Sequence, residues 1–522
     1  MKKRLCLILA ALMLLGALSA CSPAAPSQTA SPGGASKKPK SFVFGVYNFT
    51  KIDPSDNYNG WGTLRYGVGE TLFKLDDNLN VVPWLALGAG LSEDKLTWTI
   101  TLRDGVLFHN GNAMDGAAVK ASLERLVERN ERAASELMIA SITAEGNTVS
   151  ITTAQPNPTL PNALCDPYAC IVDASADDGT VDFNLAPVCT GPYKVKSFTP
   201  EVEAVLEPFP DYWGGMPALD ELVIKSIPDV DTLALAMQNG EIDAAYGLSY
   251  DTLSLFSGDD RFSITQAATA RVYMLFFNLN RPFMQDPAFR RALCMAVDKD
   301  SYGKILLNGA GTPTKSAFPS SLSYGDDALF EDVPDYDPEG ARALLLENGY
   351  RDTDGDGYLD KGGQKVTLRV VTYTRAGLPQ STQALVSALR DLGIDAAYQQ
   401  YESISQALQS GDYDLCAYSF VTAPTGDAYA FLSHTMGTGK GGNYGGYSNP
   451  QVDALLNQLA TEFDVAKRAE YAVQIQKIAL ADSSYCFMFH LNMFMVMKKG
   501  VTGLKQSPVD YYQITAETSP AA

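Results

Sequence analysis

Stretches in which apolar residues recur with the period of a strand alternate along the chain with stretches that have the period of a helix. Over residues 96–103 apolar and polar side chains alternate with a period of two, which is typical of a strand with one buried face. Asp104-Gly105 supplies turn chemistry, and residues 106–108 begin a second apolar run. Residues 117–127 follow a helical period, and Asp115 stands where a helix cap belongs. This stretch therefore predicts strand, turn, strand and helix.

The same alternation of strand and helix patterns continues to the C-terminus. Strands are predicted at residues 42–47, 143–153, 271–279, 365–372, 395–401 and 486–497, and helices at 336–350 and 381–392. Strands and helices that alternate at this spacing indicate an α/β fold with mixed sheets. A chain of 522 residues exceeds one ordinary core, so two or three domains are expected.

The N-terminus has the pattern of a targeting segment. Lys2-Lys3-Arg4 precedes an apolar run from Leu5 to Leu18, and small residues then lead to Cys21. This resembles a bacterial lipobox, which predicts a signal peptide at 1–20 and a lipidated Cys21. A cleaved signal with a chance cysteine is the alternative, and the run is short of the ~20 residues that span a bilayer. Residues 21–40 are rich in Ser, Pro, Ala and Gly and predict a flexible tether.

Composition narrows the function classes. The formal net charge is −20, and the chain lacks the basic face that a nucleic-acid binder needs. Cys6 lies in the predicted signal and Cys21 at the predicted lipidation site, and the remaining cysteines show no zinc spacing. A disulfide among Cys165, Cys170 and Cys189 is compatible with an extracellular location.

The sequence does not match the known motifs of catalysis and phosphate binding that we compared with it. The chain has three histidines, no Gly-x-Ser-x-Gly elbow and no His-Glu-x-x-His helix, so we expect no enzyme. Residues 309–316 imitate a P-loop, but Pro313 removes an amide that would bind phosphate. Residues 352–360 resemble the start of a calcium loop, yet Gly363 stands where a bidentate Glu is needed. We interpret that loop as a polar turn.

Between Gly69 and Gly111 the chain contains, in this order, the segments ETLF-x-LD, NLNVVPWLA and LSEDKLTWTITLRDGVLFHNG. This order resembles bacterial extracellular solute-binding proteins of the peptide, nickel and opine class. These are the capture subunits of ABC importers. The resemblance implies a two-lobed, periplasmic-binding-protein-like clamp with a hinge. It implies a large lobe at 41–270, to which 490–522 returns, and a second lobe at 271–489. A monomer that serves an ABC permease and ATPase, anchored by lipid at the outer face of the cytoplasmic membrane (cell surface or periplasm), is expected.

The resemblance also suggests ligand contacts. In the large lobe the candidates are Tyr47, Trp61, Arg65 and Tyr66 after the first strand and Arg132 at a helix end. In the second lobe they lie in residues 418–446, which family members use to fix ligand specificity and which we name the specificity segment. They are Tyr418, Asp427 and Tyr444, with His434 as a metal ligand. Arginine suits ligand carboxylates. The expected cargo is a nickel or related metal chelate, with no resident cofactor, and the alternative is a short peptide.

The specificity segment departs from both classes. Pro424 occupies the place where peptide binders have an aspartate that holds the α-ammonium. Asp427, three residues later, is either a substitute for it or only a helix cap. Val421 and Thr425 stand where nickel-complex binders have larger side chains.

Overall fold

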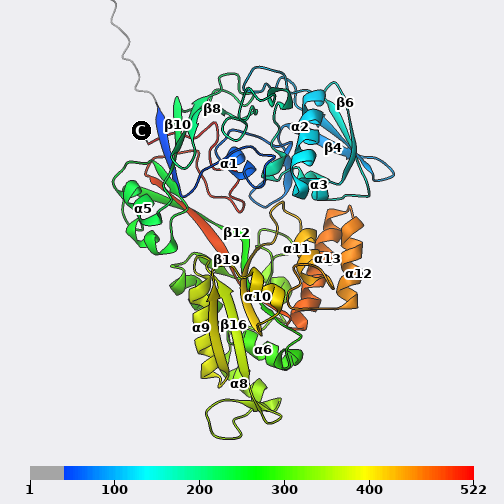
Figure 1. Cartoon of the computed structure of the whole chain (residues 1–522), viewed down its shortest axis with the longest axis vertical. Coiled ribbons are helices and arrows are strands. Elements are labelled where there is room, and N and C mark those ends of the chain that lie inside the picture. The colour runs from blue at the N-terminus through cyan, green and yellow to red at the C-terminus, as the bar shows by residue number, and fades with distance from the viewer. Residues whose placement is uncertain (1–39, 522) are drawn as a thin grey trace, which may run out of the picture. The chain divides into compact units, whose positions relative to one another are not determined.

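An eleven-stranded mixed sheet runs through the part of the chain that the structure describes, residues 40–521 of the computed structural model (Figure 1). Its strands are β1 (Ser41–Val46), β8 (Tyr193–Thr199), β9 (Glu203–Pro208), β10 (Glu221–Ser226), β11 (Ala244–Tyr246), β12 (Phe262–Phe277), β13 (Gly311–Pro313), β16 (Thr367–Tyr373), β17 (Asp395–Tyr401), β18 (Leu415–Val421) and β19 (Tyr485–Lys498). The path is β17-β16-β18-β12-β19-β11-β1-β10-β9-β8, with β13 paired to β19. Parallel pairs join β1 to β10 and β11, and β16 to β17 and β18, so the predicted α/β class with mixed sheets is confirmed.

Two long strands connect the lobes. β12 and β19 pair along most of their lengths, and Figure 1 shows them running from the upper lobe into the lower one. Their register shifts between Ala268 and Val272. The predicted lobe boundary at 270/271 lies at this irregularity and remains a prediction, as do the other boundaries.

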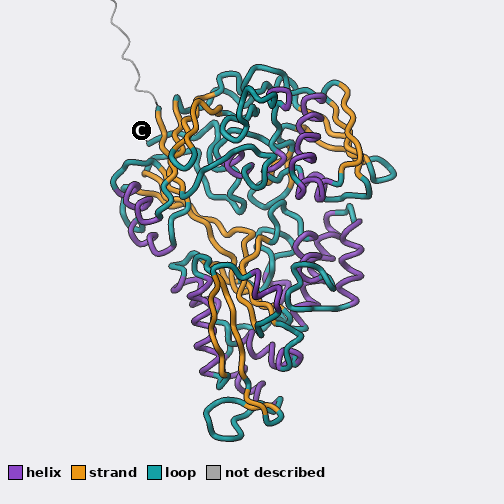
Figure 2. The backbone as a smooth tube through the Cα atoms, viewed as in Figure 1, coloured by secondary structure: helices purple, strands orange, loops and turns teal. Residues whose placement is uncertain are grey.

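Helices cover the second lobe on both sheet faces (Figure 2). They are α6 (Pro287–Met295), α8 (Pro338–Glu347), α9 (Leu378–Asp391), α10 (Ser405–Ser410), α11 (Tyr429–Met436), α12 (Pro450–Thr461) and α13 (Val465–Ala481). Leu275 and Phe277 of β12 belong to the core cluster that includes α6, α8 and α9, whereas Met274 and Phe276 belong to the cluster that includes α11, α12 and α13. The period of two in this strand therefore separates two cores.

The large lobe carries a separate four-stranded sheet and several helices. The sheet has the order β4-β5-β7-β6, formed by β4 (Ala86–Leu91), β5 (Thr97–Leu102), β6 (Ile139–Glu145) and β7 (Thr148–Thr153). Two further strands, β2 (Phe73–Leu75) and β3 (Val81–Pro83), form a hairpin. The helices include α1 (Gly60–Arg65), α2 (Gly116–Arg129), α3 (Glu131–Leu137), α4 (Leu160–Ala163) and α5 (Val230–Gln238).

Residues 96–127 fold largely as predicted. Ile100 and Leu102 are buried, and Asp115 caps α2 by accepting the amide of Ala118 at 2.9 Å. The predicted strand at 106–108 is wrong, because only an isolated bridge between Leu107 and Ala113 forms there. The signal peptide, Cys21 and almost all of the tether lie outside the described residues. Within residues 40–521, no helix combines the length and apolarity that crossing a membrane requires.

Candidate functional site

The segment that follows β18 contacts the large lobe and marks one edge of the space between the lobes. Asn162 of α4 donates its amide to the carbonyl of Thr425 at 2.8 Å, and the Tyr511 hydroxyl donates to the carbonyl of Pro424 at 3.0 Å. The resemblance to solute-binding proteins implies a ligand space between the lobes, and we call this expected space beside the segment the cleft. The Pro424 and Thr425 backbone thus joins the lobes here.

Two arginines expected to hold cargo are paired within the protein. Arg65 forms an ion pair with Asp510 and donates Nε to the Asp510 carbonyl at 2.9 Å. Arg132 donates both terminal nitrogens to Asp166, at 2.8 and 2.9 Å. Carboxylates of the protein therefore engage both guanidinium groups, and a cargo-contacting role for either arginine stays a prediction.

Asp427 is likewise occupied. Its Oδ2 accepts from Arg468 at 2.6 and 3.0 Å, and its Oδ1 accepts the amide of Tyr429 at the start of α11. This carboxylate joins α11 to α13 and does not stand free for an ammonium group. Tyr66 is 1% exposed and packs edge-on against Phe49, which places it in the core and not in the cleft.

Tyr47 and Trp61 remain candidates for ligand contact. Tyr47 is 49% exposed, and its ring lies on Gly247, where a Cβ would approach Cδ1 to 2.4 Å. Trp61 is half-buried, with its ring 5.9 Å from that of Tyr511. Its indole nitrogen has no hydrogen-bond partner in the described part of the chain.

Half-buried aromatic rings form one wall on the second lobe. The Tyr418 ring lies 5.3 Å from that of Tyr373, 5.9 Å from Phe420 and 6.3 Å from Tyr444. Burial raises the pKa of Tyr418 to about 12, so its hydroxyl is a neutral donor at physiological pH. His434 on α11 lies 6.1 Å from Phe420, and burial lowers its pKa, which keeps the imidazole neutral. A metal-ligating role for His434 stays a prediction.

Arg271 within β12 and Arg375 just after β16 are neighbouring cations that sequence reasoning missed. Burial and the neighbouring positive charge of Arg375 lower the pKa of Arg271, while Asp510 and nearby tyrosines raise it. Asp510 is already bound by Arg65 and by the Tyr246 hydroxyl. Unlike Arg65, Arg132 and Arg468, neither guanidinium forms an ion pair within residues 40–521. The one signal in the sequence was an arginine at the start of the apolar run 271–279.

A buried carboxylate links three loops of the large lobe. Glu70 accepts from the hydroxyls of Thr190 and Tyr212 at 2.8 Å and from the Trp213 indole nitrogen at 2.9 Å. Burial raises the pKa of Glu70 from 4.5 to about 7, although these hydrogen bonds lower it. Glu70 therefore fastens these loops to one another.

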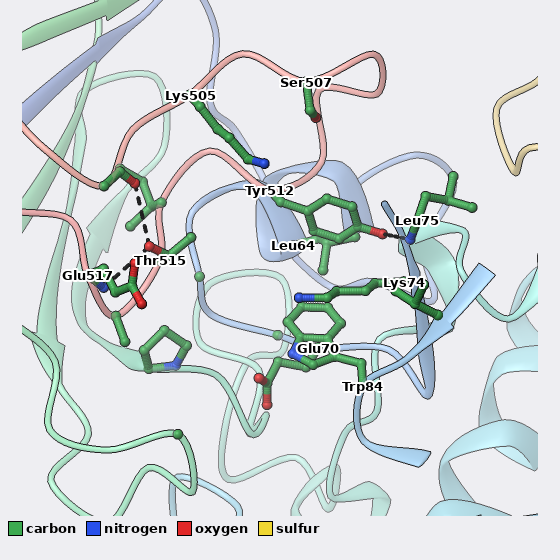
Figure 3. A pocket seen from close by; sticks show the side chains of 18 of the residues that line it. Leu64, Glu70, Lys74, Leu75, Trp84, Lys505, Ser507, Tyr512, Thr515 and Glu517 are labelled. Atoms are coloured by element: carbon green, nitrogen blue, oxygen red, sulfur yellow. Dashed lines mark hydrogen bonds between the residues drawn. The ribbon is translucent and has the colours of Figure 1, made fainter. Parts of the chain in front are cut away.

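A second candidate lies beside Glu70 in the large lobe (Figure 3). It is a cavity of about 880 Å³, bounded by the β2–β3 hairpin, the turn at 212–214 and the C-terminal segment at 503–517. We name it the hairpin cavity.

The cysteines are free in the structure. All six within the described residues are buried and unpaired, including Cys165, Cys170 and Cys189, for which a disulfide was considered. They contribute small apolar volume to the core.

The calcium-like loop gathers three exposed carboxylates. Oxygen atoms of Asp352, Asp354 and Asp356 lie within 4.8 Å of one another. Position twelve, Gly363, falls in the turn between β14 (Asp360–Lys361) and β15 (Gln364–Lys365) and offers no carboxylate. We expect calorimetric titration with Ca²⁺ to show no binding tighter than about millimolar. A micromolar site abolished by Asp354→Ala would contradict this expectation.

Comparison with known proteins agrees with this architecture. The model of bacterial extracellular solute-binding proteins, family 5 (middle region), matches residues 80–443, more than half of the chain. The glutathione-binding protein GsiB of Pectobacterium atrosepticum is 27% identical over 88% of this chain and 90% of its own length. The nickel-binding protein NikA of Staphylococcus aureus is 25% identical over 87% of this chain and 90% of its own.

Solved structures share the fold. The structure of a nickel ABC transporter protein from Bacillus halodurans superposes with a TM-score of 0.81 at 28% identity, covering 92% of this chain and all of that one. The NikA structure from Brucella suis in complex with Fe(III)-EDTA gives a TM-score of 0.80 at 24% identity, covering 92% of this chain and 99% of that one. The two-lobed fold is thereby confirmed, and the chain belongs to the family 5 bacterial extracellular solute-binding proteins of ABC importers.

Proposed function

We propose that the cleft captures a small metal chelate, of nickel or a related ion, through carboxylates of its organic ligand. The observation that carries this proposal is the pair Arg271 and Arg375, neighbouring cations that form no ion pair among the described residues, although Asp510 acts on Arg271 electrostatically. A half-buried arginine without a counter-ion is costly, and a cargo carboxylate would offset that cost. The aromatic wall around Tyr418 suits the flat faces of a chelate.

The pairing of three carboxylates with arginines favours a metal chelate over a peptide as the cargo. Asp166, Asp427 and Asp510 are each held by an arginine, so none is free to receive an α-ammonium group. In a metal–amino-acid complex the amine is a neutral metal ligand and requires no such partner. The cleft therefore suits the complex better than a free dipeptide.

Glutathione or another short peptide is the second candidate. The relatives include a protein named for glutathione binding, and glutathione carries two carboxylates that suit two arginines. Its ammonium group would have to displace one of the existing ion pairs.

The resemblance supports the remaining roles. The protein would deliver its cargo to an ABC permease with its ATPase, as a monomer without catalytic activity. A lipid on Cys21 would hold it at the outer face of the cytoplasmic membrane.

Thermal unfolding of the ligand-stripped, full-length protein in detergent tests the cargo class. Nickel–histidine complexes should raise the unfolding temperature, because a ligand that binds the native state stabilises it. Nickel alone, histidine alone, glutathione and dialanine serve as matched additions. Stabilisation by the peptides but not by the complex would contradict the proposal.

Cys21→Ala tests the anchor. The variant should leave the membrane fraction of the expressing cells, because the predicted lipid is attached to this thiol. Cys6→Ala, a change within the predicted signal, is the control and should stay membrane-bound. A Cys21→Ala protein that remains membrane-bound and uncleaved would show that the lipobox interpretation is wrong.

A further inference from the structure

We propose that Phe463 of the second lobe and Trp98 of the large lobe form a latch that holds the lobes closed, so that Phe463 raises cargo affinity through closure and not through contact. The Phe463 ring lies 6.2 Å from that of Trp98, with 33° between the ring planes. The Lys95 ammonium lies 5.2 Å from the centroid of the Phe463 ring. We name these three residues the lobe latch. The inference adds residues of a lobe contact to the proposed function and rests on that function only for the cargo used in its test.

The lobe latch lies away from the strands that connect the lobes. Phe463 stands in the turn between α12 and α13, and Trp98 lies in β5, which pairs with β4 and β7. Figure 1 shows the sheet that contains β4 above α12 on the right, whereas β12 and β19 cross between the lobes further to the left. A movement that opens the lobes about β12 and β19 would therefore separate the latch.

The large lobe holds the Trp98 ring in place. Its indole nitrogen donates to the carbonyl of Asn157 at 3.1 Å. The Asn157 side chain is buried, and its amide donates to the carbonyls of Glu136 and Leu137 at 3.0 and 3.2 Å. Because α3 and β5 fix the ring before the second lobe approaches, closing the lobes requires little further ordering of this side chain.

The turn that carries Phe463 is held by its neighbours as well. Asp464 caps α13 by accepting the amide of Ala466 at 2.9 Å. Arg468 donates to the carbonyl of Glu462, the residue before Phe463, at 2.9 Å. The half-buried Phe463 ring is therefore presented to the large lobe from a turn with a defined backbone.

Arg468 couples the lobe latch to the other contact between the lobes. Besides the Glu462 carbonyl, it binds the Asp427 carboxylate at 2.6 and 3.0 Å. Asp427 follows Gly426, whose backbone lies so close to the Leu79 carbonyl of the large lobe that a Cβ would collide with that oxygen. The latch and the Gly426 contact therefore belong to one connected part of the second lobe, and we expect them to close together.

A contact that exists only in the closed form raises the affinity for cargo. Cargo bound between the lobes favours the same closed form, and the apparent dissociation constant equals the intrinsic constant divided by the closed fraction. An aromatic pair and a cation over one of its rings each stabilise the closed form. We expect the lobe latch to contribute about tenfold to cargo affinity.

Distances between spin labels in the full-length protein in detergent test the latch without any cargo. The labels sit on two exposed positions, Thr143→Cys in β6 and Gln458→Cys in α12, and protein without these changes is the blank. Pulsed electron paramagnetic resonance should show a closed population, and Phe463→Ala should reduce its share at least about threefold. Phe463→Tyr keeps the ring and should restore the population. Val465→Ala, at a neighbouring side chain that is 79% exposed, is the matched control and should change nothing.

Cargo affinity is the second measurement, with the nickel–histidine complex as the probe. Phe463→Ala should weaken binding about tenfold, mainly through faster dissociation, because the latch opposes opening of the loaded protein. Trp98→Leu should weaken binding to a similar extent, and the double variant should lose no more than either single one, because both changes remove the same contact. Trp98→Leu also tests the contact from the other lobe if Phe463→Ala does not fold.

Equal distance distributions for the native protein and Phe463→Ala would overturn the proposal, whether or not nickel–histidine binds. Fully additive losses of affinity in the double variant would overturn it as well. A protein that does not bind nickel–histidine, but whose label distances respond to Phe463→Ala, would count against the proposed cargo and would support the latch.

Discussion

Replacing Arg271 by alanine is expected to weaken binding of a nickel–histidine complex about a hundredfold, or about 2.7 kcal/mol. Truncating one partner of a buried charge pair costs ~2–5 kcal/mol, and the partner here is a cargo carboxylate. Arg271 is half-buried whereas Arg375 is exposed, so water compensates poorly for the loss of the Arg271 charge. Calorimetric titration of the ligand-stripped variant measures the effect.

Arg129→Ala is the matched control. Arg129 pairs with Asp177 at 3.0 Å, but its side chain is 50% exposed, so its loss should leave cargo affinity unchanged. Arg271→Lys should retain part of the affinity, because an ammonium supplies the charge without the planar fork. An Arg271→Ala protein with unaltered affinity would remove the main support for a carboxylate-bearing cargo.

Glu70→Gln is expected to gain stability relative to the native protein as the pH rises. The pKa of Glu70 is about 7 in the folded chain, above its ordinary 4.5, so the folded state binds a proton that the unfolded state has released. Stability from this group is therefore full below about pH 4.5 and is lost as the pH rises through 7. Glutamine stays neutral, so the difference should grow by roughly 3 kcal/mol between pH 4.5 and pH 8.

Urea unfolding of both proteins at several pH values provides the measurement. In the glutamine the amide oxygen can still accept from Thr190 and Trp213, whereas the NH2 group has to donate to the Tyr212 hydroxyl, which reverses that one hydrogen bond. Glu517→Gln, an exposed change in the same cavity, should show no such trend. A difference that does not vary with pH would mean that Glu70 is ionised throughout.

Local patterns predicted many elements because their causes are local. The helix at 117–127 follows from an apolar period and an aspartate that caps it, and β17 coincides with the predicted 395–401. β12 begins nine residues before the predicted 271, since its first half is half-buried and mixes polar with apolar residues. The second half of β12 was predictable because a strand that is buried on both faces has a nearly continuous run of apolar residues.

The candidate site was harder to predict because charge pairing is a long-range property. Arg65 and Asp510 are 445 positions apart, so nothing near either residue showed that they neutralise each other. The place of Arg132 and Asp427 in the sequence likewise suggests ligand contact, whereas their partners Asp166 and Arg468 come from other elements. Arg271 and Arg375 became candidates only when the fold showed which arginines lacked a carboxylate.

The most direct test of the central claim is parallel calorimetric titration of the ligand-stripped, full-length protein with nickel–histidine and with dialanine and glutathione. The account predicts submicromolar binding of the complex, abolished when nickel is chelated away, and peptide binding at least about a hundredfold weaker, because arginines already hold Asp166, Asp427 and Asp510. Submicromolar binding of either peptide, with no heat from the nickel complex, would contradict it.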